Sequence, residues 1–67
     1  MNKNKLKAVM YEHGDNGGTL SAFLGIARST LSNKMNETGA EFTQSEIRKI
    51  RDRYDLTPEQ TSSIFFA

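Results

Sequence analysis

The chain has 67 residues, with nine basic and eight acidic side chains and a formal net charge of +1. A chain this short forms one domain, residues 1–67, and buries so little surface that self-association is one of the few ways left to add stability. The absence of cysteine excludes disulfides and thiolate zinc sites, and one histidine cannot build a metal site, so we expect no cofactor and no metal. No apolar run approaches the roughly 20 residues of a membrane span, and no hydrophobic leader follows the basic start, so we expect a cytoplasmic protein.

The charge is unevenly distributed along the chain. Residues 1–36 carry five basic and two acidic side chains, a net charge of +3, whereas residues 37–67 carry four basic and six acidic ones, a net charge of −2. The first half is therefore suited to face a polyanion that would repel the second half, although a random split of surface charge gives the same pattern. We expect Lys3, Lys5 and Lys7 to form a solvated or frayed arm, with phosphate binding as the alternative.

The first half of the chain predicts two helices. The earliest apolar positions repeat at the spacing of one helix face: Leu6, Val9, Met10 and His13. This spacing predicts a helix over residues 4–13 that ends at Gly14, with His13 at the edge of the core. A break over residues 15–18 then leads into a short helix over 17–24. Its predicted apolar face consists of Leu20, Phe23 and Leu24.

The remainder predicts three more helices, over residues 28–36, 44–54 and 58–66. The fourth begins with a capping box, in which Thr43 and Glu46 bond reciprocally to each other's backbone amides. The fifth begins with a similar box at Thr57 and has Pro58 at its first helical position. No segment alternates at period two, so we expect no strands and an all-α fold of five short helices.

The second and third predicted helices meet at Gly25. A tight crossing needs a turn residue that tolerates positive φ, and glycine supplies it. Ser21 is small where the two helices would approach most closely, and Ile26 fills the core from the turn. Leu31 and Met35, four residues apart, hold the third helix against the second. Together these positions predict a helix-turn-helix.

The outer face of the third predicted helix is polar: it carries Arg28, Ser29, Ser32 and Asn33. Arginine forks onto guanine, asparagine onto adenine, and serine bonds to either base or phosphate. Short hydrogen-bonding side chains suit a DNA groove better than a protein partner, which would favour aromatic residues. The alternative interpretation is a merely solvated helix face.

The run TLSAFLGIARSTLSNKMN resembles the helix-turn-helix of lambda-repressor-like (Cro/CI, XRE-type) regulators. The segments FTQSEIRKI and LTPEQ…IFF extend the resemblance over almost the whole chain, which is especially similar to short single-domain phage regulators. The resemblance implies a compact five-helix bundle that binds double-stranded DNA sequence-specifically. It implies that the third helix enters the major groove and contacts bases through Arg28, Ser29, Ser32 and Asn33. It places phosphate contacts at Gly17, Gly18, Thr19, Thr30 and Lys34.

The chain departs from the family at two places. The family usually opens its second helix with a glutamine that grips phosphate, whereas this chain has Gly17 and Gly18, whose backbone amides remain suited to bind an anion. The turn after the third helix is often basic in the family and here carries Glu37 and Glu41. We therefore expect few phosphate contacts and a shallow dependence of DNA affinity on salt.

The C-terminal segment is the predicted contact between two copies. Residues 64–66 (Ile-Phe-Phe) are too apolar to be left in water by one short helix, and the two adjacent phenylalanines cannot both face one side of it. One is expected in the core, and the other is either a shielded surface residue or, as we favour, part of a dimer contact. We therefore expect a homodimer, at least on DNA. Its predicted interface comprises Asp55, Leu56, Thr57, Pro58, Ile64, Phe65 and Phe66.

An enzyme is not expected, because one histidine supports no Ser/His/Asp set and a domain this small offers no deep pocket. The leading prediction is a sequence-specific DNA-binding regulator of transcription, probed most directly with duplex DNA. The alternative is a protein-interaction adaptor, antirepressor-like or antitoxin-like, on the same helical scaffold.

Overall fold

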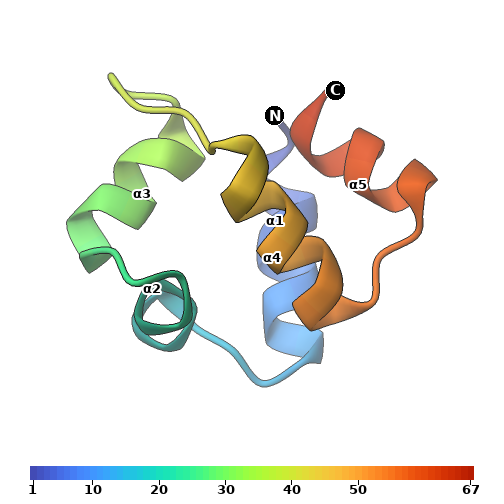
Figure 1. Cartoon of the computed structure of the whole chain (residues 1–67), viewed down its shortest axis with the longest axis horizontal. Helices are drawn as coiled ribbons and strands as arrows, with labels where there is room; N and C mark the ends of the chain where they lie inside the picture. Colours follow the sequence, from blue (N-terminus) through green and yellow to red (C-terminus); the bar gives the residue numbers. More distant parts are fainter.

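The computed structural model describes all 67 residues and contains five helices and no strands (Figure 1). The helices are α1 (Lys3–Glu12), α2 (Gly17–Leu24), α3 (Arg28–Asn36), α4 (Gln44–Tyr54) and α5 (Pro58–Phe65). The predicted all-α class is confirmed, and α2, α3 and α4 have the predicted bounds. None of the helices has the length and apolar character that crossing a membrane requires.

Local hydrogen bonds explain where the helices begin. α4 and α5 start with the two predicted capping boxes. α2 starts with a third, in which the Asn16 side chain accepts from the Thr19 amide at 2.9 Å and the Thr19 hydroxyl accepts from the Asn16 amide at 2.8 Å. α1 begins one residue earlier than predicted because the Asn2 side chain accepts from the Lys5 amide at 3.1 Å. Each cap satisfies amide groups that have no partner within the first helical turn.

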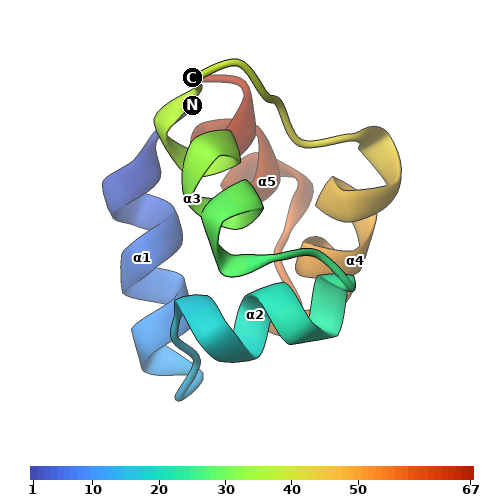
Figure 2. The same ribbon diagram turned by 90° about the vertical axis from the view of Figure 1, so that its left-hand side faces the viewer.

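All five helices contribute side chains to one core. Figure 2 shows α3 at the front between α1 and α4, with α2 crossing below them and α5 behind. α3 and α5 therefore lie on opposite sides of the core, which leaves the outer face of α3 uncovered. The buried apolar residues are Leu6, Met10, Leu20, Leu24, Leu31, Met35, Ile47, Ile50, Tyr54, Leu56, Ile64 and Phe65.

Phe23 lies further from the core than the sequence predicts. Phe23 is 43% exposed, and its ring lies beneath the Arg53 guanidinium, 4.4 Å from ring centroid to the central carbon. Ser21, not Phe23, completes the buried side of α2, because only a small side chain fits where α3 approaches. His13 is exposed, and its ring packs against Tyr54 with the centroids 4.9 Å apart.

The predicted dimer surface is partly wrong. Leu56, Ile64 and Phe65 belong to the core of the monomer, with at most 9% of their surface exposed. They are buried because α5 is the helix that closes the back of the bundle, and Phe65 packs edge-on against Phe42 with the ring centroids 5.5 Å apart. Phe66, which follows the end of α5, is 62% exposed. The prediction that one phenylalanine of the pair enters the core and the other does not is thus confirmed.

Candidate nucleic-acid interface

The turn between α2 and α3 has the predicted geometry. Gly25 adopts φ +73°, a left-handed conformation that costs a residue with a side chain about 1–2 kcal/mol. The Ile26 amide donates to the Ser21 carbonyl at 3.0 Å, which ends α2 and turns the chain into α3. The Ser21 hydroxyl is turned inward and donates to the Gly18 carbonyl at 3.0 Å. Figure 1 shows the consequence: α2 is seen end-on, whereas α3 lies above it and is seen from the side.

The outer face of α3 is as open as predicted. Leu31 and Met35 are buried against the bundle, which turns Ser29, Ser32 and Asn33 to the surface, where all three are exposed. Thr30, predicted to contact phosphate, is half-buried at one side of this face. α3 therefore presents a row of hydroxyl and amide groups along its exposed side.

Arg28 occupies the first position of α3 and is exposed. Its side chain lies along the start of α2, because a Cβ added at Gly18 would be 3.8 Å from the Arg28 Cδ and Nε atoms. No hydrogen bond or ion pair with another residue fixes the guanidinium. Gly17 and Gly18 form the first turn of α2, where backbone amides have no helical partner.

Two of the predicted phosphate contacts, Thr19 and Lys34, have partners within the protein instead. The Thr19 amide donates to Asn16, and its hydroxyl donates to the Asp15 carboxylate at 2.9 Å, so both groups are engaged within the protein. The Lys34 ammonium donates to the Glu46 carboxylate at 2.7 Å and is only 12% exposed. Lys34 sits three positions after Leu31, which turns it toward the start of α4 and away from the outer face.

The loop that follows α3 forms an acidic flank of the α3 face. Its carboxylates are Glu37 and Glu41, and Glu46 follows in the first turn of α4. Burial of Glu46 raises its pKa, but hydrogen bonds from Lys34 and the Thr43 amide outweigh burial and lower the pKa overall. Glu37 accepts from the N-terminal ammonium group at 2.6 Å. With Lys34 neutralised in this way, the flank offers a DNA phosphate no free cation.

A buried carboxylate fixes the helix-turn-helix to the rest of the bundle. The Asp15 side chain, 6% exposed, accepts two hydrogen bonds from the Arg53 guanidinium, at 2.7 and 2.8 Å. It also accepts from the Tyr54 hydroxyl at 2.7 Å and from the Thr19 hydroxyl. The bonds from Arg53 hold the pKa of Asp15 far below its usual range, against the opposing effect of burial. Asp15 thus ties the start of α2 to the end of α4.

The lysines at the start of the chain belong to α1 and do not form a frayed arm. The Lys3 ammonium donates to the Asn36 side chain at 2.8 Å, which links α1 to the last residue of α3. The Lys5 ammonium points the other way and donates to the Ser63 hydroxyl on α5. Lys7 forms no such bond and lies with Lys3 on the side of α1 that faces α3.

The outer face of α3, the start of α2 and the side of α1 that faces α3 therefore lie together on one side of the molecule (Figure 2). Comparison of the chain with models of known protein families, with curated proteins and with solved structures finds no match.

Proposed function

We propose that this protein is a DNA-binding regulator of transcription, of the lambda-repressor-like helix-turn-helix type, that places α3 in the major groove. The observation that carries the proposal is the uncovered polar face of α3, which is turned outward because Leu31 and Met35 pack into the core on the opposite side of the helix. A nine-residue helix is about 14 Å long, and the major groove, about 12 Å wide, admits one helix.

The side chains on this face match the chemistry of base edges. Asn33 offers the donor and acceptor pair that adenine binds, and Arg28 offers the fork that guanine binds. Ser29 donates and accepts, whereas the Ser32 hydroxyl accepts from the Asn36 side chain at 3.3 Å and keeps its proton to donate to a base or a phosphate. These four residues are the proposed base contacts.

Selection of binding sites from random duplex DNA tests the proposal directly. We expect the protein to enrich one short motif. The double variant Ser29→Ala, Asn33→Ala should fold normally, because both side chains are exposed, and should fail to enrich it. Failure of the unaltered protein to enrich any sequence would contradict the proposal. It would favour the alternative of a protein-interaction adaptor, which the acidic loop after α3 also suits.

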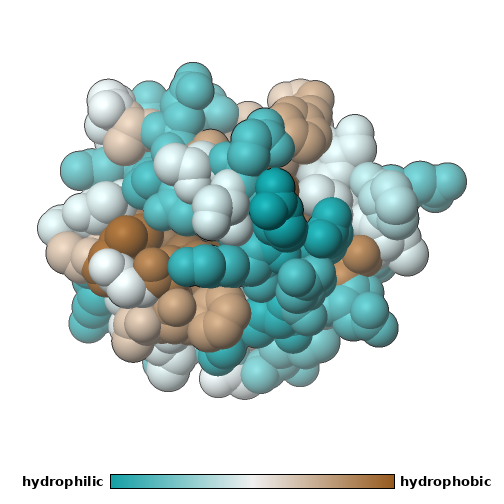
Figure 3. Space-filling view, viewed as in Figure 1, coloured by the Kyte–Doolittle hydropathy of each residue, from teal (hydrophilic) through white to brown (hydrophobic).

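We further propose that two copies bind DNA as a symmetric pair. Each mismatched base pair typically weakens the free energy of binding by about 1–3 kcal/mol. Because one monomer has only four base-reading side chains, it discriminates too few base pairs to select a site by itself. A two-fold pair on half-sites about 34 Å apart doubles that number. Of the large hydrophobic residues predicted at the contact, Phe66 alone is exposed, and Figure 3 shows a hydrophobic group beside the C-terminus.

Phe66→Ala should therefore reduce cooperative binding to a two-half-site duplex while leaving affinity for a single half-site unchanged. The exposed Phe66 ring contributes little to the core, so the midpoint of thermal unfolding should stay the same. Tyr11→Ala is the matched control, because it removes another exposed aromatic ring, 68% exposed, from a different surface. Unchanged cooperativity in the Phe66 variant would show that the contact lies elsewhere.

A further inference from the structure

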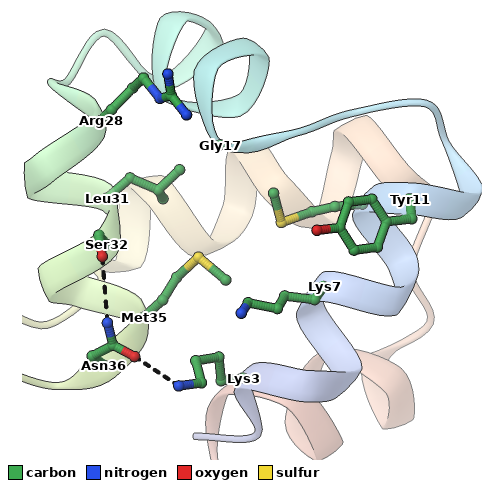
Figure 4. A pocket seen from close by; sticks show the side chains of 10 residues that line it. Lys3, Lys7, Tyr11, Gly17, Arg28, Leu31, Ser32, Met35 and Asn36 are labelled. Atoms are coloured by element: carbon green, nitrogen blue, oxygen red, sulfur yellow. Dashed lines mark hydrogen bonds between the residues drawn. The ribbon is translucent and has the colours of Figure 1, made fainter.

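α1 and α3 face each other across a groove of about 200 Å³ that is lined by three cations and no carboxylate (Figure 4). Two matching rows of side chains form its rims. Lys3, Lys7 and Tyr11 follow one another at intervals of four residues on α1, so they lie on one side of that helix. The row on α3 has the same spacing and consists of Arg28, Ser32 and Asn36.

The two rows run in opposite directions. Lys3 at the start of α1 donates to Asn36 at the end of α3, at 2.8 Å. At the other end, Arg28 lies beside Gly17, and Tyr11 ends the α1 row on the opposite side of the groove (Figure 4). In that view the Lys7 ammonium and the Tyr11 hydroxyl both point into the groove.

The shape of the groove excludes several occupants. Its volume falls below the roughly 300–1,000 Å³ of sites that enclose an organic ligand. Its floor is apolar, formed by Met10, Leu31 and Met35, so polar groups of a ligand are bonded only at the rims. An elongated polyanion that lies along the groove fits better, because it is contacted from both rims and needs no enclosure.

We infer that the groove between α1 and α3 binds the sugar-phosphate backbone of one DNA strand, with Lys7 and Lys3 as its phosphate-binding cations. The inference rests on the proposed function, since a helix inserted in the major groove has one strand on each side. Eight residues of helix rise about 12 Å, enough to follow about two or three consecutive phosphates. The polar rim residues that are not proposed base contacts are Lys3, Lys7, Tyr11 and Asn36, and all four are of types that bond to phosphate oxygens.

Phosphate binding through this groove would occur on only one flank of α3. The α1 flank of α3 carries free cations, whereas the flank formed by the loop after α3 carries Glu37 and Glu41 and a neutralised Lys34. In the family that the chain resembles, the turn after the third helix is often basic. Here α1 supplies the cations that this turn lacks.

Lys7→Gln tests the inference, because Lys7 is exposed and bonds to nothing else in the protein. On a duplex with a single half-site, which binds one copy, removal of one phosphate-binding cation should reduce the slope of log affinity against log salt by about 0.9. Between 50 and 200 mM salt, the affinity of the variant should therefore fall about 3.5-fold less than that of the unaltered protein. Because phosphates carry no sequence information, the variant should lose affinity equally for the selected site and for random duplex DNA.

Arg48→Gln is the control, since it removes one exposed cation from α4 without touching the groove. Arg48 lies two residues after Glu46, which faces α3, so it projects about 200° round α4 from that contact. Its salt slope should equal that of the unaltered protein. The thermal unfolding midpoints of both variants should also be unchanged, which separates loss of binding from loss of folding.

Replacing single phosphates of the duplex by neutral methylphosphonates locates the contact. At the phosphate that Lys7 binds, the methylphosphonate should weaken the unaltered protein and have no effect on the Lys7 variant. If the unaltered protein enriches a DNA motif but Lys7→Gln leaves the salt slope unchanged, the groove does not bind phosphate. The proposed function would still stand. No enrichment of any motif would overturn both. Weaker capture of an acidic protein by the variant, with DNA affinity unchanged, would assign the groove to that partner instead.

Discussion

Replacing Asp15 by asparagine is expected to lower the free energy of unfolding by about 2–4 kcal/mol. The substitution keeps the size of the side chain but removes the charge that the Arg53 guanidinium faces. Asparagine also presents a donor group where the aspartate only accepts, so it cannot satisfy all four bonds from Arg53, Tyr54 and Thr19. A 67-residue domain has only about 3–10 kcal/mol of stability, so the loss should be plain in a denaturant titration.

The control is Asp52→Asn. Asp52 pairs with Arg51 at 3.3 Å, but the two side chains are 69% and 44% exposed. An ion pair in water contributes between zero and about 1 kcal/mol, so this variant should unfold almost like the unaltered protein. Equal losses in the two variants would show that general charge balance, not the buried network, sets the stability.

Acid should destabilise the protein through the same carboxylate. The pKa of Asp15 is depressed in the folded state, so its contribution to stability is fully present above the unfolded pKa of about 3.9 and is lost as the pH falls below that value. The Asp15→Asn variant has no such group to protonate. Its stability should therefore fall less steeply than that of the unaltered protein between about pH 5 and pH 2, which parallel denaturant titrations at each pH would measure.

The sequence predicts the helices well because their ends carry local signals. The left-handed turn at Gly25 and the capping boxes of α4 and α5 each depend on residues within four positions of one another. The sequence does not predict the capping box of α2, because Thr19 takes the place of the usual Glu or Gln.

Contacts between distant residues explain what the sequence does not predict. Asp15 looks like a loop residue until the fold brings Arg53, 38 positions later, against it. Lys34 looks like a free cation until α4 places Glu46 beside it. The spacing of Lys3 and Lys7 is visible in the sequence, but the helix that they face is set only by the packing of α1 against the rest of the bundle.

Arg28→Ala is expected to weaken binding to the selected DNA site by about 1–3 kcal/mol, or about 5- to 150-fold, with a smaller loss on random DNA. Arg28 begins α3, the end of the helix that reaches deepest into the groove in this docking mode. No contact within the protein competes for its guanidinium, which lies only against the start of α2. Titrations of both duplexes with the variant and with Arg48→Ala, which removes a cation remote from α3, measure the difference.

Arg28→Lys decides between the two ways in which Arg28 can act. Lysine keeps the positive charge but lacks the planar fork that holds the two acceptor atoms of guanine. If Arg28 reads a base, the lysine variant should lose nearly as much affinity for the selected site as the alanine variant, while the salt slope stays unchanged. The opposite result has two parts: Arg28→Lys binds both duplexes like the unaltered protein, and Arg28→Ala loses equal affinity for both. That result would assign Arg28 to the phosphates of the α1–α3 groove. Sequence discrimination would then rest on Ser29, Ser32 and Asn33.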